Sequence, residues 1–200
     1  MNKVAQYLQQ HLNGEIITSP DALEYFSTDE SILRITPQLA LYPRSENDVR
    51  KVARFTWQLA EKGRAVPITA RGMGTDQTGA SLGTGIILVT PAHMNRIIEL
   101  DPKTGVVTAE AGITLDKLQQ VLYTHGRFLP PVSSVNQTAT LGGAVSNDDS
   151  GRGSYKYGPM QRFVRSLRVV LANGEVIDTG RISKRELSKK LGLASFEGEI

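Results

Sequence analysis

The sequence predicts an α+β fold built from two units, and three observations support this. Strand and helix patterns alternate in the first half, as in β-α-β units with parallel strands. The second half contains two hairpin patterns, which are typical of antiparallel pairing. Each half also carries a dense cluster of glycines, at 72–85 and at 142–158. We therefore expect a small parallel β-α-β unit, followed by a mixed or antiparallel sheet with helices.

The composition is that of an ordinary globular protein. The chain has 200 residues, of which 40% are hydrophobic and 22% charged, and a net charge of +3. This mild excess of positive charge permits an anionic ligand, but it lacks the dense basic stripe of a nucleic-acid-binding protein. The longest aliphatic run, 86–89, is far shorter than the roughly 20 residues of a membrane span. The N-terminus lacks the apolar segment of a signal peptide. We expect a cytoplasmic location, in solution or peripheral at the membrane, with no nucleic-acid partner and no membrane span.

The residues most often used in metal and nucleophile chemistry are scarce. The absence of cysteine excludes disulfides, thiolate metal sites and cysteine nucleophiles from this chain. The three histidines have no metal-ligand spacing and form no Ser-His-Asp pattern, so packing or surface roles are expected for them. We predict no metal site and assign no catalytic residue.

An N-terminal lead-in is expected over residues 1–38. Apolar residues at helical spacing predict a helix that ends at Gly14. The rest of the lead-in is expected to be irregular, with Tyr25 and Phe26 as anchors on the main body.

Residues 39–90 are expected to form the first unit. Ser45 and Asp48 resemble a helix-capping pair, and Gly63 is placed to end that helix. The strands that flank and follow the helix are expected at residues 39–42, 66–70 and 86–89.

Residues 91–200 are expected to form the second unit. Turn sequences at 101–105 and 173–174 each join two strand patterns, which predicts two hairpins. Helices are expected after Thr114 and after Ser183, where a capping box begins.

The first glycine cluster, within residues 70–80, is neither of the two best-known phosphate loops. It lacks the Gly-Lys-Ser/Thr of a Walker A loop, and Gln77 stands where a Rossmann fingerprint has its third glycine. Glycines at positive φ can turn successive N–H groups inward and so form a nest for an anion. A flexible surface loop without a ligand is the alternative. The predicted binding residues are Arg71, Gly72, Met73, Gly74, Thr75, Asp76 and Gly79.

The second cluster follows a stiff Pro-Pro pair at 130–131. Adjacent glycines before small residues would let a flat ligand approach the backbone, and nearby polar side chains offer hydrogen bonds. A tight turn between packed elements is the alternative here. The predicted binding residues are Pro131, Thr140, Gly142, Gly143, Ser146 and Asn147.

Together these segments resemble the FAD-linked oxidase superfamily, with its PCMH-type (vanillyl-alcohol-oxidase-type) flavin domain. The segment Pro67-x-x-x-Arg71-Gly72-x-Gly74-Thr75-x-x-x-Gly79 looks like the pyrophosphate loop of that domain. The segment 139–147 after Pro130-Pro131 resembles its second flavin-contacting segment. Lys156-Tyr157-Gly158 and the hairpin at 169–176 resemble the next segments of the D-lactate, glycolate and 2-hydroxyglutarate dehydrogenase branch. The resemblance spans residues 39–180.

The resemblance implies FAD bound noncovalently between two subdomains, with its pyrophosphate on loop 70–80. Covalent members carry a histidine where this chain has Thr75. It also implies hydride transfer from a 2-hydroxy acid substrate, and electron transfer to a quinone, an electron-transfer protein or an iron–sulfur module. The second unit lacks the closing strand of relatives, and no substrate domain comes after it, so we expect a fragment of a longer oxidoreductase.

One pair of residues departs from the family pattern. Asp148 and Asp149 stand where relatives usually carry small neutral residues, and two acids beside a dianionic ligand would need to point away from it. Two other functions stay open. One is a reductase of the same fold that takes hydride from NADPH, and the other is an interaction module that has kept the fold without a ligand.

Overall fold

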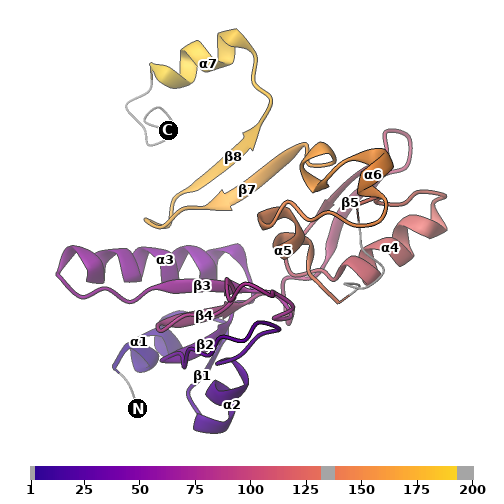
Figure 1. Ribbon diagram of the computed structural model, residues 1–200. Coiled ribbons are helices and arrows are strands. Elements are labelled where there is room, and N and C mark those ends of the chain that lie inside the picture. Colours follow the sequence, from indigo (N-terminus) through magenta and orange to yellow (C-terminus); the bar gives the residue numbers. More distant parts are fainter. Residues whose placement is uncertain (1–2, 132–137, 193–200) are drawn as a thin grey trace.

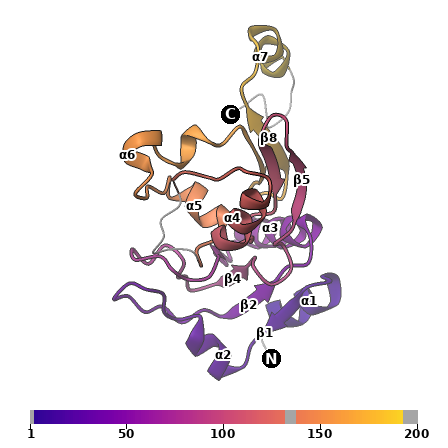
Figure 2. The same ribbon diagram turned by 90° about the vertical axis from the view of Figure 1, so that its right-hand side faces the viewer.

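The computed structural model describes residues 3–131 and 138–192 (Figure 1). A four-stranded sheet with its helices lies at one end of the molecule and the C-terminal helix at the other, with α4 and α5 between them (Figure 2). None of the described helices is long and apolar enough to cross a membrane.

The N-terminal sheet contains β1 (Glu15–Ile17), β2 (Leu39–Tyr42), β3 (Ile68–Arg71) and β4 (Ile86–Val89) in the order β1-β2-β4-β3. Helix α3 (Glu46–Glu61) connects β2 to β3. Strands β2 and β3 both run parallel to β4, which lies between them. The parallel β-α-β unit is thus confirmed, with the third strand of the unit inserted at its centre.

The lead-in contains more regular structure than its sequence predicted. Helix α1 (Lys3–His11) agrees with the prediction, but strand β1 and helix α2 (Pro20–Tyr25) lie where irregular chain was expected. This expectation was wrong because three residues of β1 are too few to show alternation, and the strand forms by antiparallel pairing with β2. Phe26 is a buried anchor as predicted, whereas the Tyr25 side chain is 64% exposed.

Both faces of the sheet are buried at its two central strands, which explains the uninterrupted apolar sequence of β2 and β4. Because side chains alternate between the faces of a strand, neighbouring residues of β2 and β4 enter different cores. Helices α1 and α3 cover one face through the core residues Val4, Leu8, Leu39, Leu41, Val52, Ile86 and Leu88. The other face packs against the N-terminal segment through Phe26, Ala40, Ile87 and Val89.

The second unit begins with an antiparallel hairpin of β5 (Ile97–Asp101) and β6 (Val106–Ala109). Helix α4 (Leu115–Thr124) begins at the Thr114 cap, whose Oγ1 accepts from the Lys117 N–H, and packs on this hairpin. Three short helices come next, namely α5 (Leu141–Ser146), α6 (Ser154–Tyr157) and the 3-10 helix η1 (Met160–Arg162).

A second hairpin, β7 (Ser166–Val170) and β8 (Val176–Gly180), leads to helix α7 (Lys184–Leu191), which begins with the predicted capping box. Within the described residues, this hairpin does not join β5 and β6, so the second unit has two antiparallel pairs rather than one sheet. The physical reason lies in its packing, because β7 contacts α3 of the first unit.

Candidate functional site

The two glycine-rich segments meet at one pocket of about 270 Å³. One wall follows the carboxyl ends of β3 and β4, and the other consists of α5 and its flanking residues. Parallel strands end at the same edge of a sheet, and ligands of α/β proteins commonly bind there. The volume lies just below the range of roughly 300–1,000 Å³ for small-molecule pockets.

Of the residues predicted from the sequence, all but Gly79 and Pro131 line this pocket. Gly79, at φ +84°, instead faces the side chain of Leu33. Sequence reasoning missed several small residues, which carry little signal of their own. Thr90 is different, because it directly follows β4 and the strand-end rule points to it. The additional lining residues are Ala70, Ala80, Ser81, Thr90, Ala111, Ala139, Ala144 and Asp149.

The loop that follows β3 presents unused hydrogen-bond donors. Gly74 has a φ of +75°, which reverses the chain at the pocket wall. In the part of the chain that the structure describes, no acceptor is found for the backbone N–H groups of Met73, Gly74 and Thr75. Met73 is exposed, whereas Gly74 is buried and Thr75 half-buried. Buried N–H groups ordinarily have partners, so the donors of Gly74 and Thr75 fit an anionic ligand.

Asp76 gives the loop a defined shape. Its Oδ2 accepts from the Thr78 N–H at 2.9 Å, the Thr78 hydroxyl at 2.8 Å and the Ala80 N–H at 2.8 Å. Burial by itself would raise the pKa of Asp76. These bonds and one from the Asn147 side chain outweigh the effect of burial and hold the pKa below its usual value. The loop is therefore internally bonded, unlike the flexible surface loop of the alternative interpretation.

The Arg71 side chain is buried beneath the same loop, with 4% of its surface exposed. Its Nη2 donates to the Thr28 carbonyl at 2.9 Å, and the guanidinium lies 5.9 Å from the Tyr25 ring and 5.6 Å from the Phe26 ring. Its Nη1 is buried and has no hydrogen-bond partner among the described residues. Burial lowers the pKa of Arg71, yet a guanidinium stays charged in proteins. A ligand with anionic oxygens would satisfy this donor and offset its charge.

The second glycine cluster forms a helix rather than an open loop. Thr140 caps α5 and accepts from the Gly143 N–H, while the Gly142 N–H donates to the Ala111 carbonyl at 2.8 Å. A β-carbon on Gly142 would lie 2.9 Å from the Ala111 β-carbon. The small size of Gly142 thus serves helix packing, in line with the structural alternative. Gly143 has a single close neighbour, the Thr140 Oγ1 at 3.3 Å from such a carbon.

The two acids that depart from the family pattern separate in the structure. Asp148 adopts φ +49°, a conformation that Asp tolerates better than most residues. Its carboxylate accepts from the Gln161 N–H at 2.8 Å, away from the pocket as expected. Asp149 lines the pocket, so for this residue the expectation was wrong. Burial, together with the charges of Asp76 and Asp148, raises the pKa of Asp149.

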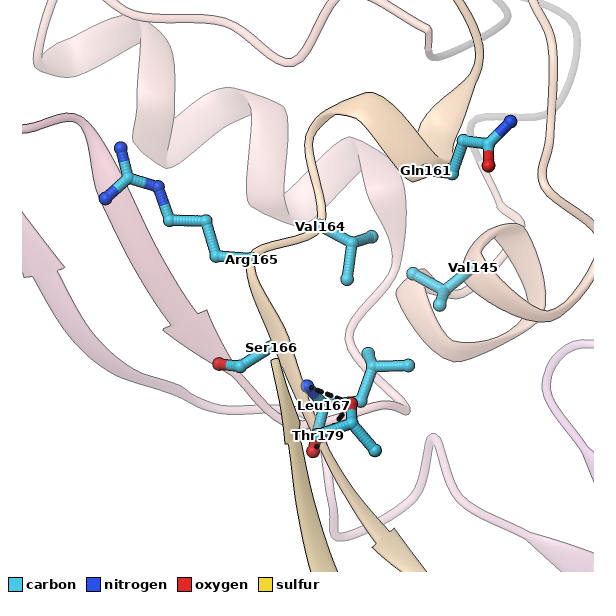
Figure 3. A pocket seen from close by; sticks show the side chains of 7 residues that line it. All are labelled: Val145, Gln161, Val164, Arg165, Ser166, Leu167 and Thr179. Atoms are coloured by element: carbon cyan, nitrogen blue, oxygen red, sulfur yellow. Dashed lines mark hydrogen bonds between the residues drawn. The ribbon is translucent and has the colours of Figure 1, made fainter. Parts of the chain in front are cut away.

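A separate hollow of about 300 Å³ lies between α5 and the start of β7 (Figure 3). It contains none of the predicted binding residues. Much of its lining is aliphatic, and the Thr179 hydroxyl on one side is engaged with the backbone of Leu167. It is lined by Val145, Gln161, Val164, Arg165, Ser166, Leu167 and Thr179.

No metal site is found among the charged groups that the structure describes. No group of three or more His, Cys, Asp or Glu within residues 3–131 and 138–192 could hold a metal ion. None of the three histidines lines the candidate pocket, and His93 instead pairs with Glu15 at 2.7 Å.

The family described as FAD binding domain matches residues 37–180, which include both walls of the pocket. The chain belongs to this family of FAD-binding domains. The predicted PCMH-type flavin fold and the FAD cofactor are thereby confirmed. The unused donors at Arg71 and in the loop after it fit the anionic part of this cofactor.

Named relatives of this FAD-binding domain are dehydrogenases and oxidases. It is 39% identical to the D-2-hydroxyglutarate dehydrogenase of Escherichia coli (strain K12), over 96% of this chain and 19% of that protein. It is 32% identical to the glycolate oxidase subunit GlcD of Bacillus subtilis (strain 168), over 84% of this chain and 33% of that protein. The chain thus spans a third or less of either relative.

Among solved structures, the crystal structure of 6-hydroxy-D-nicotine oxidase from Arthrobacter nicotinovorans matches with a TM-score of 0.70. The match covers 88% of this chain and 38% of that chain, at 23% identity. At this identity the likeness shows the fold alone.

Proposed function

We propose that this FAD-binding domain serves a dehydrogenase that oxidises a 2-hydroxy acid. The observation that carries the proposal is the set of unused donors on one pocket wall, the Arg71 Nη1 and the N–H groups after it. The names of relatives, which include dehydrogenases of D-2-hydroxyglutarate and D-lactate, support the substrate class.

In this proposal the loop after β3 holds the diphosphate of FAD. The N–H groups of Met73, Gly74 and Thr75 would donate to its oxygens, and Arg71 would supply a fixed positive charge. The opposite wall, with Thr140 and the other lining residues of α5, would hold the adjoining part of the cofactor. FAD, when bound, supplies a two-electron acceptor for hydride. Gly79 and Pro131 stay predictions as binding residues, with roles outside this pocket.

The proposal keeps the division into a lead-in at 1–38 and subdomains at 39–90 and 91–200. It places the substrate-binding part outside this chain, together with the acceptor, which would be a quinone, an electron-transfer protein or an iron–sulfur module. Attachment would be noncovalent, because the chain has no cysteine and carries Thr75 at the position of the covalent histidine. We keep a cytoplasmic location, in solution or peripheral at the membrane, as part of the proposal.

FAD titration of the purified protein in its full natural length tests the role of the loop. Arg71→Ala should weaken FAD binding at least tenfold, because it removes the only cation that lines the pocket among the described residues. The matched control Arg64→Ala changes an exposed arginine on the connection between α3 and β3 and should leave affinity unchanged. Equal affinity of Arg71→Ala and the unsubstituted protein would show that the loop has been assigned wrongly.

The same preparation tests the reaction. Anaerobic reduction of the bound flavin by a D-2-hydroxy acid, with no reduction by NADPH, is the expected result. Reduction by NADPH alone would favour the reductase of the same fold. A folded protein that stays colourless after incubation with FAD would instead be an interaction module.

A further inference from the structure

Two acidic residues line the pocket, Asp76 and Asp149. Among the described residues, no hydrogen-bond donor reaches the side chain of Asp149. Asp76, on the opposite wall, accepts three bonds from its own loop. By contrast, no hydrogen bond reaches the Asp149 carboxylate within residues 3–131 and 138–192, although its backbone is fixed by bonds to Ala144 and Met160. Of the two carboxyl groups in the pocket, one is thus hydrogen-bonded and the other is not. Such a difference in environment separates the pKa values of two groups, so that at a given pH one can be ionised while the other is neutral.

The charges that act on the Asp149 carboxyl group are negative and do not offset the charge of its ionised form. Asp76 on the β3–β4 loop and Asp148 at the end of α5 are both acidic, and both act on its carboxyl group. Arg71, the cation on the same pocket wall as Asp76, donates to Thr28 and is not among the charges that act on the Asp149 carboxyl group. No described histidine lines the pocket. Desolvation and like charge act in the same direction here, and both favour the neutral carboxyl group.

A diphosphate placed in this pocket would add further negative charge beside Asp149. We propose that the pocket accepts the diphosphate of FAD with a proton bound to Asp149, so that cofactor loading takes up this proton from solvent. The inference rests on the proposed placement of the diphosphate on the loop after β3. The neutral carboxyl group also becomes a hydrogen-bond donor, which a phosphate oxygen can accept. FAD binding therefore strengthens as the pH falls and weakens as it rises.

Isothermal titration of the protein in its full natural length with FAD tests this, at several pH values between 6 and 8. Buffers of different ionisation enthalpy report the protons taken up per FAD bound. For the unsubstituted protein we expect proton uptake, and a Kd that increases up to tenfold for each pH unit above the pKa of Asp149. Asp149→Asn, which mimics the neutral carboxyl group, should lose both the uptake and the pH dependence, and should bind more tightly than the unsubstituted protein at pH 8.

The matched control is Asp148→Asn. It changes the neighbouring carboxylate, which bonds to Gln161 and does not line the pocket, and Asn also tolerates the left-handed conformation. It should retain proton uptake, with the pH dependence of Kd moved toward lower pH, because one of the negative charges that raise the pKa of Asp149 is removed. Circular dichroism of each variant checks folding.

Two results would overturn the inference. One is proton uptake and a pH dependence of Kd that are the same in Asp149→Asn and the unsubstituted protein. The other is weaker binding of Asp149→Asn at every pH, which would mean that the ionised carboxylate accepts from a ligand hydroxyl. A folded protein that binds no FAD at any pH would overturn the proposed function itself, and this inference with it.

Discussion

Gly72 lies so close to Thr140 that a β-carbon on the glycine would come within 2.4 Å of the Thr140 Oγ1. Gly72 follows β3 in the first unit, and Thr140 caps α5 in the second. The contact joins the two glycine-rich segments at the pocket. Thr140 is itself buried, with 3% of its surface exposed, so it has little room to move aside.

Gly72→Ala should therefore separate the two pocket walls. Overpacking of this kind typically lowers the free energy of unfolding by about 1–3 kcal/mol, and FAD affinity should fall with it. Gly192→Ala is the control, because its β-carbon would have no neighbour closer than 3.6 Å among the described residues and its φ is −85°. Denaturant unfolding and FAD titration measure both effects. Equal stability of the two variants would show that the walls can move apart freely.

Asp76→Asn should loosen the loop after β3. The carboxylate accepts three hydrogen bonds from its own loop, and its loss should cost about 1–2 kcal/mol of unfolding free energy for a partly exposed group. Since its pKa is lowered in the folded state, this stabilisation is present above the unfolded-state pKa of about 3.9 and disappears as the pH falls through the folded-state value. Unfolding at pH 7 and at successively lower pH should show the difference between the two proteins shrinking below about pH 4. A difference that is constant with pH would contradict the role of the charge.

Asp48→Ala should be the more damaging change at the start of α3. The Asp48 side chain is fully buried and accepts from the Asn13 N–H at 3.1 Å and the Arg44 N–H at 2.9 Å. Its removal leaves two backbone donors without a partner, at about 1–3 kcal/mol each. Ser45→Ala removes one long cap bond of 3.4 Å and should cost about 1 kcal/mol or less. Thermal unfolding of both variants tests this order, and the reverse order would refute it.

The stability of the β7–β8 hairpin should depend more on Gly174 than on the ion pairs of Arg168. Arg168 bonds to Glu46 on α3 and to Asp178, but these side chains are largely exposed. Arg168→Ala should cost at most about 1 kcal/mol, and less at high salt.

Gly174→Ala should cost more than Arg168→Ala, because Gly174 has φ +81° and its β-carbon would lie 2.6 Å from the Arg50 carbonyl oxygen on α3. Hydrogen exchange of the hairpin amides should rise strongly in Gly174→Ala and slightly in Arg168→Ala. A larger rise in Arg168→Ala would show that the ion pairs hold the hairpin in place.

Local features of this chain could be predicted from its sequence because short-range bonds decide them. Ser45, Thr114 and Ser183 each cap the helix that was expected after them, by accepting from a backbone N–H three residues on. Gly63 ends the helix over 46–61, at φ +75°, because few other residues tolerate that conformation. The order of the two glycine segments was also sufficient to indicate the family.

The rest was decided by contacts between distant residues. Strand β1 forms because it pairs with β2 at the edge of the sheet. Position 142 requires a glycine because Ala111 lies against α5. Asp148 and Asp149 are adjacent in sequence, but their side chains lie in different directions. The reason is that Asp148 adopts the left-handed conformation, in which its carboxylate accepts a bond from Gln161. The sequence by itself determined which residues could build a flavin site. Only the tertiary structure decided which of them share a pocket, because that depends on how the two units pack.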